Sequence, residues 1–208
     1  ILAKAPSQYL WAGIGDTYAK YYEAMISSRD ERLEHFTAVG VAVSQMCRDP
    51  LLLYSAQALE DHKQGLCTYA VEQVVLAIVV TTGIASIFLT KDYTPDYNSG
   101  LAHAIFYALT AYPVIEERHL HGEVVAFGIL IALLVDGQKE EFEKIYELNK
   151  SIGLPTRLSD IEITPAQWEE CLEVIPTMSD VAHYPYKVTR PMLEDAMKTL
   201  EERAVSHR

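Results

Sequence analysis

The apolar residues of this 208-residue chain recur at helical spacing in one segment after another. Apolar positions three and four residues apart predict amphipathic helices, whereas strict alternation predicts strands. No stretch of the chain alternates convincingly. The pattern therefore predicts an all-α fold in a single helical domain over residues 1–208. The unequal lengths of the segments favour an irregular multi-helix bundle over a symmetric four-helix one.

Capping residues, glycines and prolines set the ends of the expected helices. The expected spans are 7–28, 31–47, 49–62, 65–89, 98–112, 122–135, 138–151 and 164–174, with a last charged helix from 189. We expect Ser7 to cap the first helix, and Gly13 and Gly15 to interrupt it. Residues 91–98 read as a polar turn.

Two of these segments are strongly apolar. Residues 74–89 contain no charge, but the run is shorter than the roughly 20 residues that a membrane span needs. We therefore expect a buried core helix there and no membrane partner. Residues 122–135 are apolar on every side, which predicts a helix that is buried all round.

The charge and the cysteines restrict the class of protein. A net charge of −12 argues against a surface that binds nucleic acid or anionic membrane. Cys47, Cys67 and Cys171 form no C-x-x-C pair, so we expect three buried thiols in a reducing, cytoplasmic setting. The chain begins at Ile1 rather than at methionine, which suggests a piece of a longer protein.

Three residues carry candidate metal chemistry. His103 and His121 open two successive apolar segments, and Asp16 lies far upstream among apolar neighbours. Each has an ordinary alternative: a hydrogen-bonded core histidine, or an aspartate that caps a helix or pairs with Lys20. A metal would compensate both rings for the solvation lost on burial. Two histidines and one carboxylate also leave a coordination position open, as in catalytic sites.

The other histidines are not expected to be ligands. His119 is two residues from His121 and should point elsewhere, so we expect it at the rim of the site. His35, His62, His183 and His207 stand in polar surroundings and read as solvated or capping residues. No phosphate-binding glycine loop follows a predicted strand, so the sequence identifies no nucleotide-binding residues.

Three segments also match a family pattern: Ile1–Ala24, Gly100–Ala104 and His121–Gly128. They resemble the metal-dependent, group III alcohol dehydrogenases in the branch around glycerol dehydrogenase. The resemblance implies an N-terminal α/β domain that binds NAD(P) and a C-terminal helical domain that binds the metal. This chain looks like the helical domain alone, and we expect the enzyme to be a homo-oligomer. Asp16, His103 and His121 match the family's metal ligands.

Two departures from the family pattern matter. Lys20 stands where the iron-type members carry an extra histidine, which favours zinc over Fe²⁺ or another divalent metal. Phe106 and Tyr107 replace a His-Asn pair that is typical of glycerol dehydrogenases. We expect these two aromatic residues to contact the substrate. They indicate a substrate other than plain glycerol, such as a 2-hydroxy or 2-oxo acid or a longer vicinal diol.

The expected function is that of an NAD(P)-dependent alcohol or polyol dehydrogenase, in which the metal polarises the substrate hydroxyl while hydride leaves for the nicotinamide. The isolated chain, without a cofactor domain, should be inactive. A 2-hydroxycarboxylate dehydrogenase of the same superfamily remains an alternative, because the opening segment is also similar to that branch. A helical binding module without catalysis is a second alternative.

Overall fold

The computed structural model describes residues 5–90 and 97–205, and this part of the chain is helical, with no strand. The all-α prediction is thus confirmed. The helices are α1 (Ser7–Ser27), α2 (His35–Ser44), α3 (Asp49–Lys63), α4 (Tyr69–Leu76), α5 (Thr82–Leu89), α6 (Leu101–Leu109), α7 (Pro113–Arg118), α8 (His121–Val135), α9 (Lys139–Ile152), α10 (Pro165–Cys171) and α11 (Arg190–Val205). Most of the polar turn expected at 91–98 lies outside the described residues.

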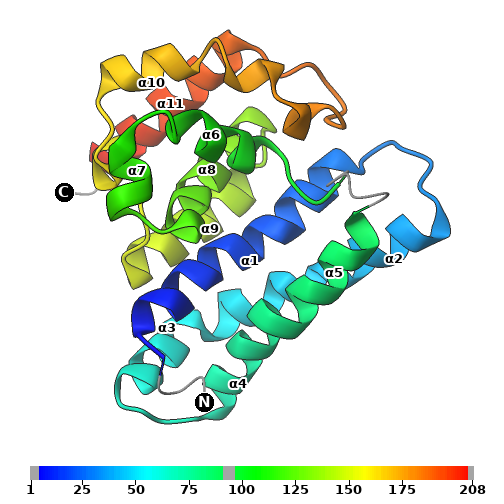
Figure 1. The fold of residues 1–208 in the computed structure, drawn as a ribbon, viewed down its shortest axis with the longest axis vertical. Helices are drawn as coiled ribbons and strands as arrows, with labels where there is room; N and C mark the ends of the chain where they lie inside the picture. Colours follow the sequence, from blue (N-terminus) through cyan, green and yellow to red (C-terminus); the bar gives the residue numbers. More distant parts are fainter. Residues whose placement is uncertain (1–4, 91–96, 206–208) are drawn as a thin grey trace.

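Helix α1 separates the molecule into two groups of helices (Figure 1). Helices α2 to α5 lie on one side of it, and α6 to α11 lie on the other. Helix α8 packs against α1, α6, α9 and α11, so it is the centre of the second group. The result is the irregular multi-helix bundle that the sequence predicts.

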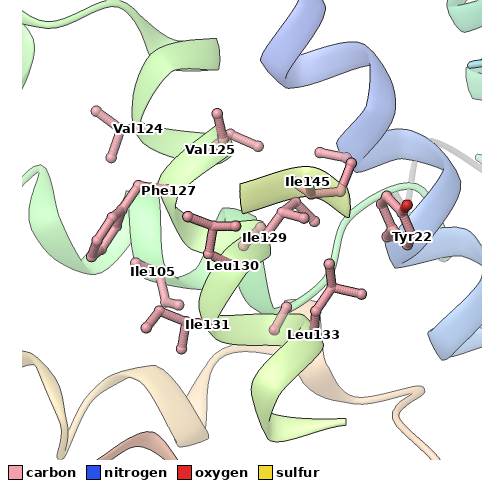
Figure 2. Packing of buried hydrophobic residues seen from close by; sticks show 14 of the residues in the cluster. Tyr22, Ile105, Val124, Val125, Phe127, Ile129, Leu130, Ile131, Leu133 and Ile145 are labelled. Carbon is pink, nitrogen blue, oxygen red and sulfur yellow. The ribbon is translucent and has the colours of Figure 1, made fainter. Parts of the chain in front are cut away.

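The apolar segment at 122–135 forms the core helix that its composition predicts. Figure 2 shows side chains of α8 pointing in several directions around its axis, toward Ile105 of α6, Ile145 of α9 and Tyr22 of α1. Every α8 residue from Gly122 to Leu133 except Glu123 is buried. Burial at about 25 cal/mol per Å² of apolar surface makes this helix the main hydrophobic anchor of the α6–α11 group.

The glycines of α1 do not interrupt the helix, contrary to the prediction. Helix α1 is continuous, and Gly15 lies against the start of α8. A Cβ atom on Gly15 would lie 2.3 Å from the carbonyl oxygen of Gly122, and one on Gly122 would lie 2.1 Å from that of Ala12. These glycines therefore allow the two backbones to approach more closely than any side chain would permit.

The long apolar stretch near residue 80 is not a core helix, so that prediction is wrong. Thr68 caps α4 by accepting a hydrogen bond from the Val71 amide, and a π-helical turn, Ala77–Thr81, joins α4 to α5. Only 22% of the most apolar window in Tyr69–Leu89 is buried. By length and composition it could cross a membrane, which a single helix of this kind only weakly indicates.

Several helix ends also differ from the prediction. Helix α2 begins four residues later than expected, and the short helix α7 was not expected. Pro6 rather than Ser7 occupies the cap position of α1, without a side-chain cap bond. Cys47 and Cys171 are buried as expected, but Cys67 is exposed because it lies in the turn between α3 and α4.

Candidate metal site

Three side chains from three helices meet at one point. Asp16 comes from α1, His103 from α6 and His121 from α8. The Asp16 Oδ1 atom lies 3.6 Å from His103 Nε2 and 3.4 Å from His121 Nε2. One ligand atom from each residue lies within 4.8 Å of the others, so a single metal ion could reach all three. The fold therefore assembles the three-residue set that was proposed from the sequence.

The helix crossing described above brings two of these residues together. Asp16 follows Gly15, and His121 precedes Gly122, so each ligand is the immediate neighbour of a glycine at the α1–α8 contact. A Cβ atom on Gly122 would also lie 3.0 Å from Cβ of Asp16. Any larger residue at either glycine would separate the two helices and with them the two ligands.

The third ligand is held by a buried carboxylate. Glu23 is fully buried, and its Oε1 accepts a hydrogen bond from the His103 backbone N–H at 3.0 Å. Its Oε2 lies 2.6 Å from His103 Nδ1. This contact leaves Nε2 as the ring nitrogen that faces Asp16 and His121.

The charges of the site reinforce one another. Burial alone would raise the pKa of Asp16, but the neighbouring imidazoles of His103 and His121 hold it well below its usual range. Burial lowers the pKa of His103, but Glu23 and Asp16 together raise it to about 10. The two carboxylates, Asp16 and Glu23, therefore stabilise a positive charge at the centre of the cluster, either a proton on His103 or a bound cation.

The donor set fits a divalent metal. Asp16 Oδ1 is buried and has no hydrogen-bond partner within the described residues. A buried carboxylate oxygen without a hydrogen bond is costly, and a metal would satisfy it. Imidazole and carboxylate are ordinary zinc ligands, and three of them leave a position for a substrate oxygen. The His121 side chain is 42% exposed, so the site is open on one side.

The two aromatic residues proposed to bind substrate lie beside the histidine rings. The Phe106 ring stands edge-on to His121 with centroids 4.4 Å apart. The centroid of Tyr107 is 6.2 Å from that of His103, and Tyr107 is 47% exposed. Both residues are therefore placed where they could border a molecule that occupies the open side of the cluster.

Lys20 and His119 have other partners. Lys20 Nζ donates to the backbone oxygen and the side-chain Oδ1 of Asn98, so no ion pair with Asp16 forms. His119 is not at the rim, because its side chain is 7% exposed and its Nδ1 lies 2.9 Å from Glu123. Glu123 also accepts the Leu120 backbone N–H at the start of α8.

The remaining histidines agree only in part with the prediction. His62 is buried, contrary to expectation, because the inner face of α3 carries it toward α1 and α4. His183 Nδ1 pairs with Glu31 at 3.0 Å, and His35 is exposed at the start of α2. His207 lies outside the described residues.

Glu23 was not identified from the sequence as a functional residue. It follows Asp16 by seven residues, which is two helical turns, so both carboxylates lie on one face of α1. That spacing could have pointed to Glu23. What it could not provide was the partner, since His103 is eighty positions away along the chain.

Comparison with known proteins finds relatives that are dehydrogenases. It is 34% identical over 206 residues to hydroxycarboxylate dehydrogenase A of Escherichia coli K12. The aligned region covers 97% of this chain and 56% of that protein. It is 32% identical over 192 residues to glycerol dehydrogenase of Thermotoga maritima, covering 86% of this chain and 48% of that protein. No family model matches the sequence.

The chain is a homologue of the glycerol and hydroxycarboxylate dehydrogenases. Its fold agrees: a probable glycerol dehydrogenase from Sinorhizobium meliloti 1021 superposes with a TM-score of 0.83 at 30% identity, over 99% of this chain and 58% of that one. These findings confirm the resemblance drawn from the sequence. The chain spans about half the length of the curated relatives it matches.

Proposed function

We propose that this chain is the metal-binding catalytic domain of an NAD(P)-dependent alcohol or polyol dehydrogenase. The observation that carries the proposal is the convergence of Asp16, His103 and His121 around an unsatisfied carboxylate oxygen. Homology to dehydrogenases supports the same assignment. A helical binding module without catalysis would need no such open, three-ligand cluster.

Asp16, His103 and His121 would hold the metal in the proposed site. When bound, a divalent metal supplies Lewis-acid chemistry that lowers the pKa of a substrate hydroxyl before hydride transfer. Glu23 keeps the His103 ring in place, and the exposed side of His121 admits the substrate. Phe106 and Tyr107 would orient the substrate and exclude water on one side.

Zinc is the metal we propose. Three ligands of the nitrogen and oxygen type with one open position are typical of catalytic zinc. Lys20 occupies the position at which the iron-type pattern has a histidine. Its side chain is buried, with 6% of the residue exposed, and donates a hydrogen bond to Asn98. It therefore offers no fourth protein ligand. Fe²⁺ is the alternative that metal analysis would distinguish.

The nicotinamide cofactor would come from a domain beyond this chain. The relatives are about twice as long as the matched region, and the described helices contain no strand-turn-helix phosphate site. We propose that the longer protein is a cytoplasmic homo-oligomer whose partners are small alcohols or hydroxy acids. The 208-residue chain alone should bind metal and show no turnover.

A 2-hydroxycarboxylate is the second candidate substrate. Hydroxycarboxylate dehydrogenase A is named for that class, and it matches nearly the whole chain. Phe106 and Tyr107 add support, since they present aromatic surface beside the cluster rather than the hydrogen-bonding groups that a triol would need.

Metal titration of the purified chain tests the proposed site. We expect one zinc per chain in the wild type, and loss of at least 100-fold in affinity in His103→Ala and in His121→Ala, because each removes one of three protein ligands. His35→Ala, on the exposed start of α2, serves as the control and should bind like the wild type. Wild-type affinity in both site variants would overturn the assignment.

A further inference from the structure

Among the described residues, the fully buried Glu23 carboxylate has one ion-pair partner, His103. Both of its oxygens face His103, one at the backbone N–H and one at ring Nδ1. A buried carboxylate is stable only when its charge is matched by hydrogen bonds or positive charge. Glu23 therefore depends on His103 as much as His103 depends on Glu23.

The side chain of Glu23 packs closely against Gly100. A Cβ atom on Gly100 would lie 3.1 Å from Cγ of Glu23, so the backbone before α6 presses directly on the carboxylate stem. Tyr184, on the same side, accepts the Leu101 backbone N–H at 3.0 Å. The start of α6 is thus fixed by two groups, Glu23 and Tyr184, and His103 is the third residue of that helix.

The geometry also selects one tautomer of the His103 ring. A carboxylate can only accept hydrogen bonds, so the proton must be on Nδ1. In the neutral ring, which is the form that a metal binds, the Nε2 lone pair is then directed toward Asp16 and His121. Within the described residues His121 has no carboxylate at Nδ1, since its ring lies against Phe106 and His103 and its Nε2 faces Asp16.

We infer that Glu23 is the positioning residue of the metal site: it locks His103 in the Nδ1–H tautomer and makes its Nε2 a stronger ligand. The inference rests on the proposed metal site and goes beyond it, because Glu23 itself would not touch the metal. Carboxylates that hold a metal-bound histidine typically contribute 10–100-fold to metal affinity.

Glu23→Gln is the sharpest test, because it preserves the shape but removes the charge. If the amide oxygen keeps the backbone N–H of His103, the amide nitrogen must face Nδ1 and donate to it. That contact would move the ring proton to Nε2, the ligand atom. We expect zinc affinity of the 208-residue chain, measured by competition with a chromophoric chelator, to fall 10–100-fold.

Glu123→Gln is a matched control from the same chain. Glu123 has the same two kinds of contact, with a backbone N–H and a histidine Nδ1, but its histidine is His119, which is not a proposed ligand. We expect its zinc affinity to stay within about threefold of the wild type. Equal affinity in Glu23→Gln and wild type would overturn the inference while leaving the metal site intact. No zinc binding by the wild type would instead overturn the proposed function.

The ring tautomer gives an independent readout if Glu23→Gln does not fold. Long-range ¹H–¹⁵N NMR of the zinc-loaded wild type should show His103 protonated at Nδ1 and bound to the metal through Nε2. Metal coordination through Nδ1 would overturn the inference, because Glu23 would then have no proton to accept.

Discussion

At the scale of single residues, two carboxylates on one face of α1 have different environments and different roles. Asp16 is half-buried and opens toward solvent, whereas Glu23 is fully buried behind His103. The first is suited to touch a metal directly, and the second to hold the histidine that does. Their seven-residue spacing aligns both with the same side of the helix.

Phe106 and Tyr107 provide a prediction about substrate choice in the full-length enzyme. We expect kcat/KM to be lower for glycerol than for a 2-hydroxy acid, because an unpaired hydroxyl costs about 1–3 kcal/mol at an aromatic surface. Phe106→His combined with Tyr107→Asn should raise kcat/KM for glycerol about tenfold.

Steady-state kinetics on both substrates, with metal content measured in parallel, check this prediction. Tyr69→Asn is the control, since Tyr69 is exposed on α4 and contacts Tyr54 rather than the histidines. If glycerol is already the best substrate of the wild type, these two aromatic residues do not set specificity.

At the scale of helices, the α1–α8 crossing determines both the core and the site. Ridges of side chains normally hold helix axes 8–10 Å apart, and glycine at the contact allows a closer approach. Here the two glycines at the crossing are the neighbours of two ligand candidates. Packing and metal chemistry therefore depend on the same contact.

Gly122→Ala tests this dependence. The new Cβ atom would meet the Ala12 carbonyl oxygen at 2.1 Å, so the helices must separate. We expect a loss of about 1–3 kcal/mol in the free energy of unfolding. Zinc affinity should also fall at least tenfold, because Asp16 moves away from His121.

Gly83→Ala is the matched control for that experiment. Gly83 is also a helical glycine, but a Cβ atom there would meet nothing within 4 Å. Alanine is the better helix former, so this variant should gain about 0.5–1 kcal/mol and keep its zinc affinity. Urea denaturation and chelator competition measure both quantities. Equal effects of the two substitutions would show that the crossing is not tight.

At the scale of the whole molecule, one ionic cluster ties distant segments together. Arg48, just before α3, donates to Glu141 of α9 and to the Tyr22 hydroxyl of α1, each at 3.0 Å. Tyr22 in turn donates to Glu141 at 2.7 Å. This cluster therefore links both groups of helices across α1.

The pKa of Glu141 gives a pH prediction. Burial raises it, but hydrogen bonds from Lys144, Tyr22 and Arg48 lower it to about 2. Because the folded pKa lies below the unfolded value of about 4.3, the stabilisation is complete above that pH and is lost as the pH falls toward 2. Because solvent screens this partly exposed group, we expect Glu141→Gln to lose only about 1–2 kcal/mol at pH 7 and to flatten the pH dependence in this window.

Urea unfolding between pH 7 and 2.5 measures the effect. Glu140→Gln removes an exposed neighbour on the same helix and should follow the wild-type curve. Wild-type and Glu141→Gln curves that stay parallel down to pH 2.5 would contradict the assignment of the low pKa to the cluster.

The sequence by itself determined the fold class, most helix positions and the three ligand candidates. Helical periodicity is a local property, so α8 and α9 could be placed to within a residue or two. The three candidate ligands could also be identified from the sequence, because they are polar residues in apolar segments. A polar group among apolar neighbours needs a partner wherever it lies in the fold.

Only the tertiary structure decided which face of each helix is buried and which polar groups meet. The apolar segment of α4 and α5 reads like a core helix, but too few other helices cover it. Gly15 reads like an interruption and is instead a packing contact. Glu23 could be paired with His103 only by the fold, because contacts between residues far apart in the chain follow from how the helices pack and leave no local pattern.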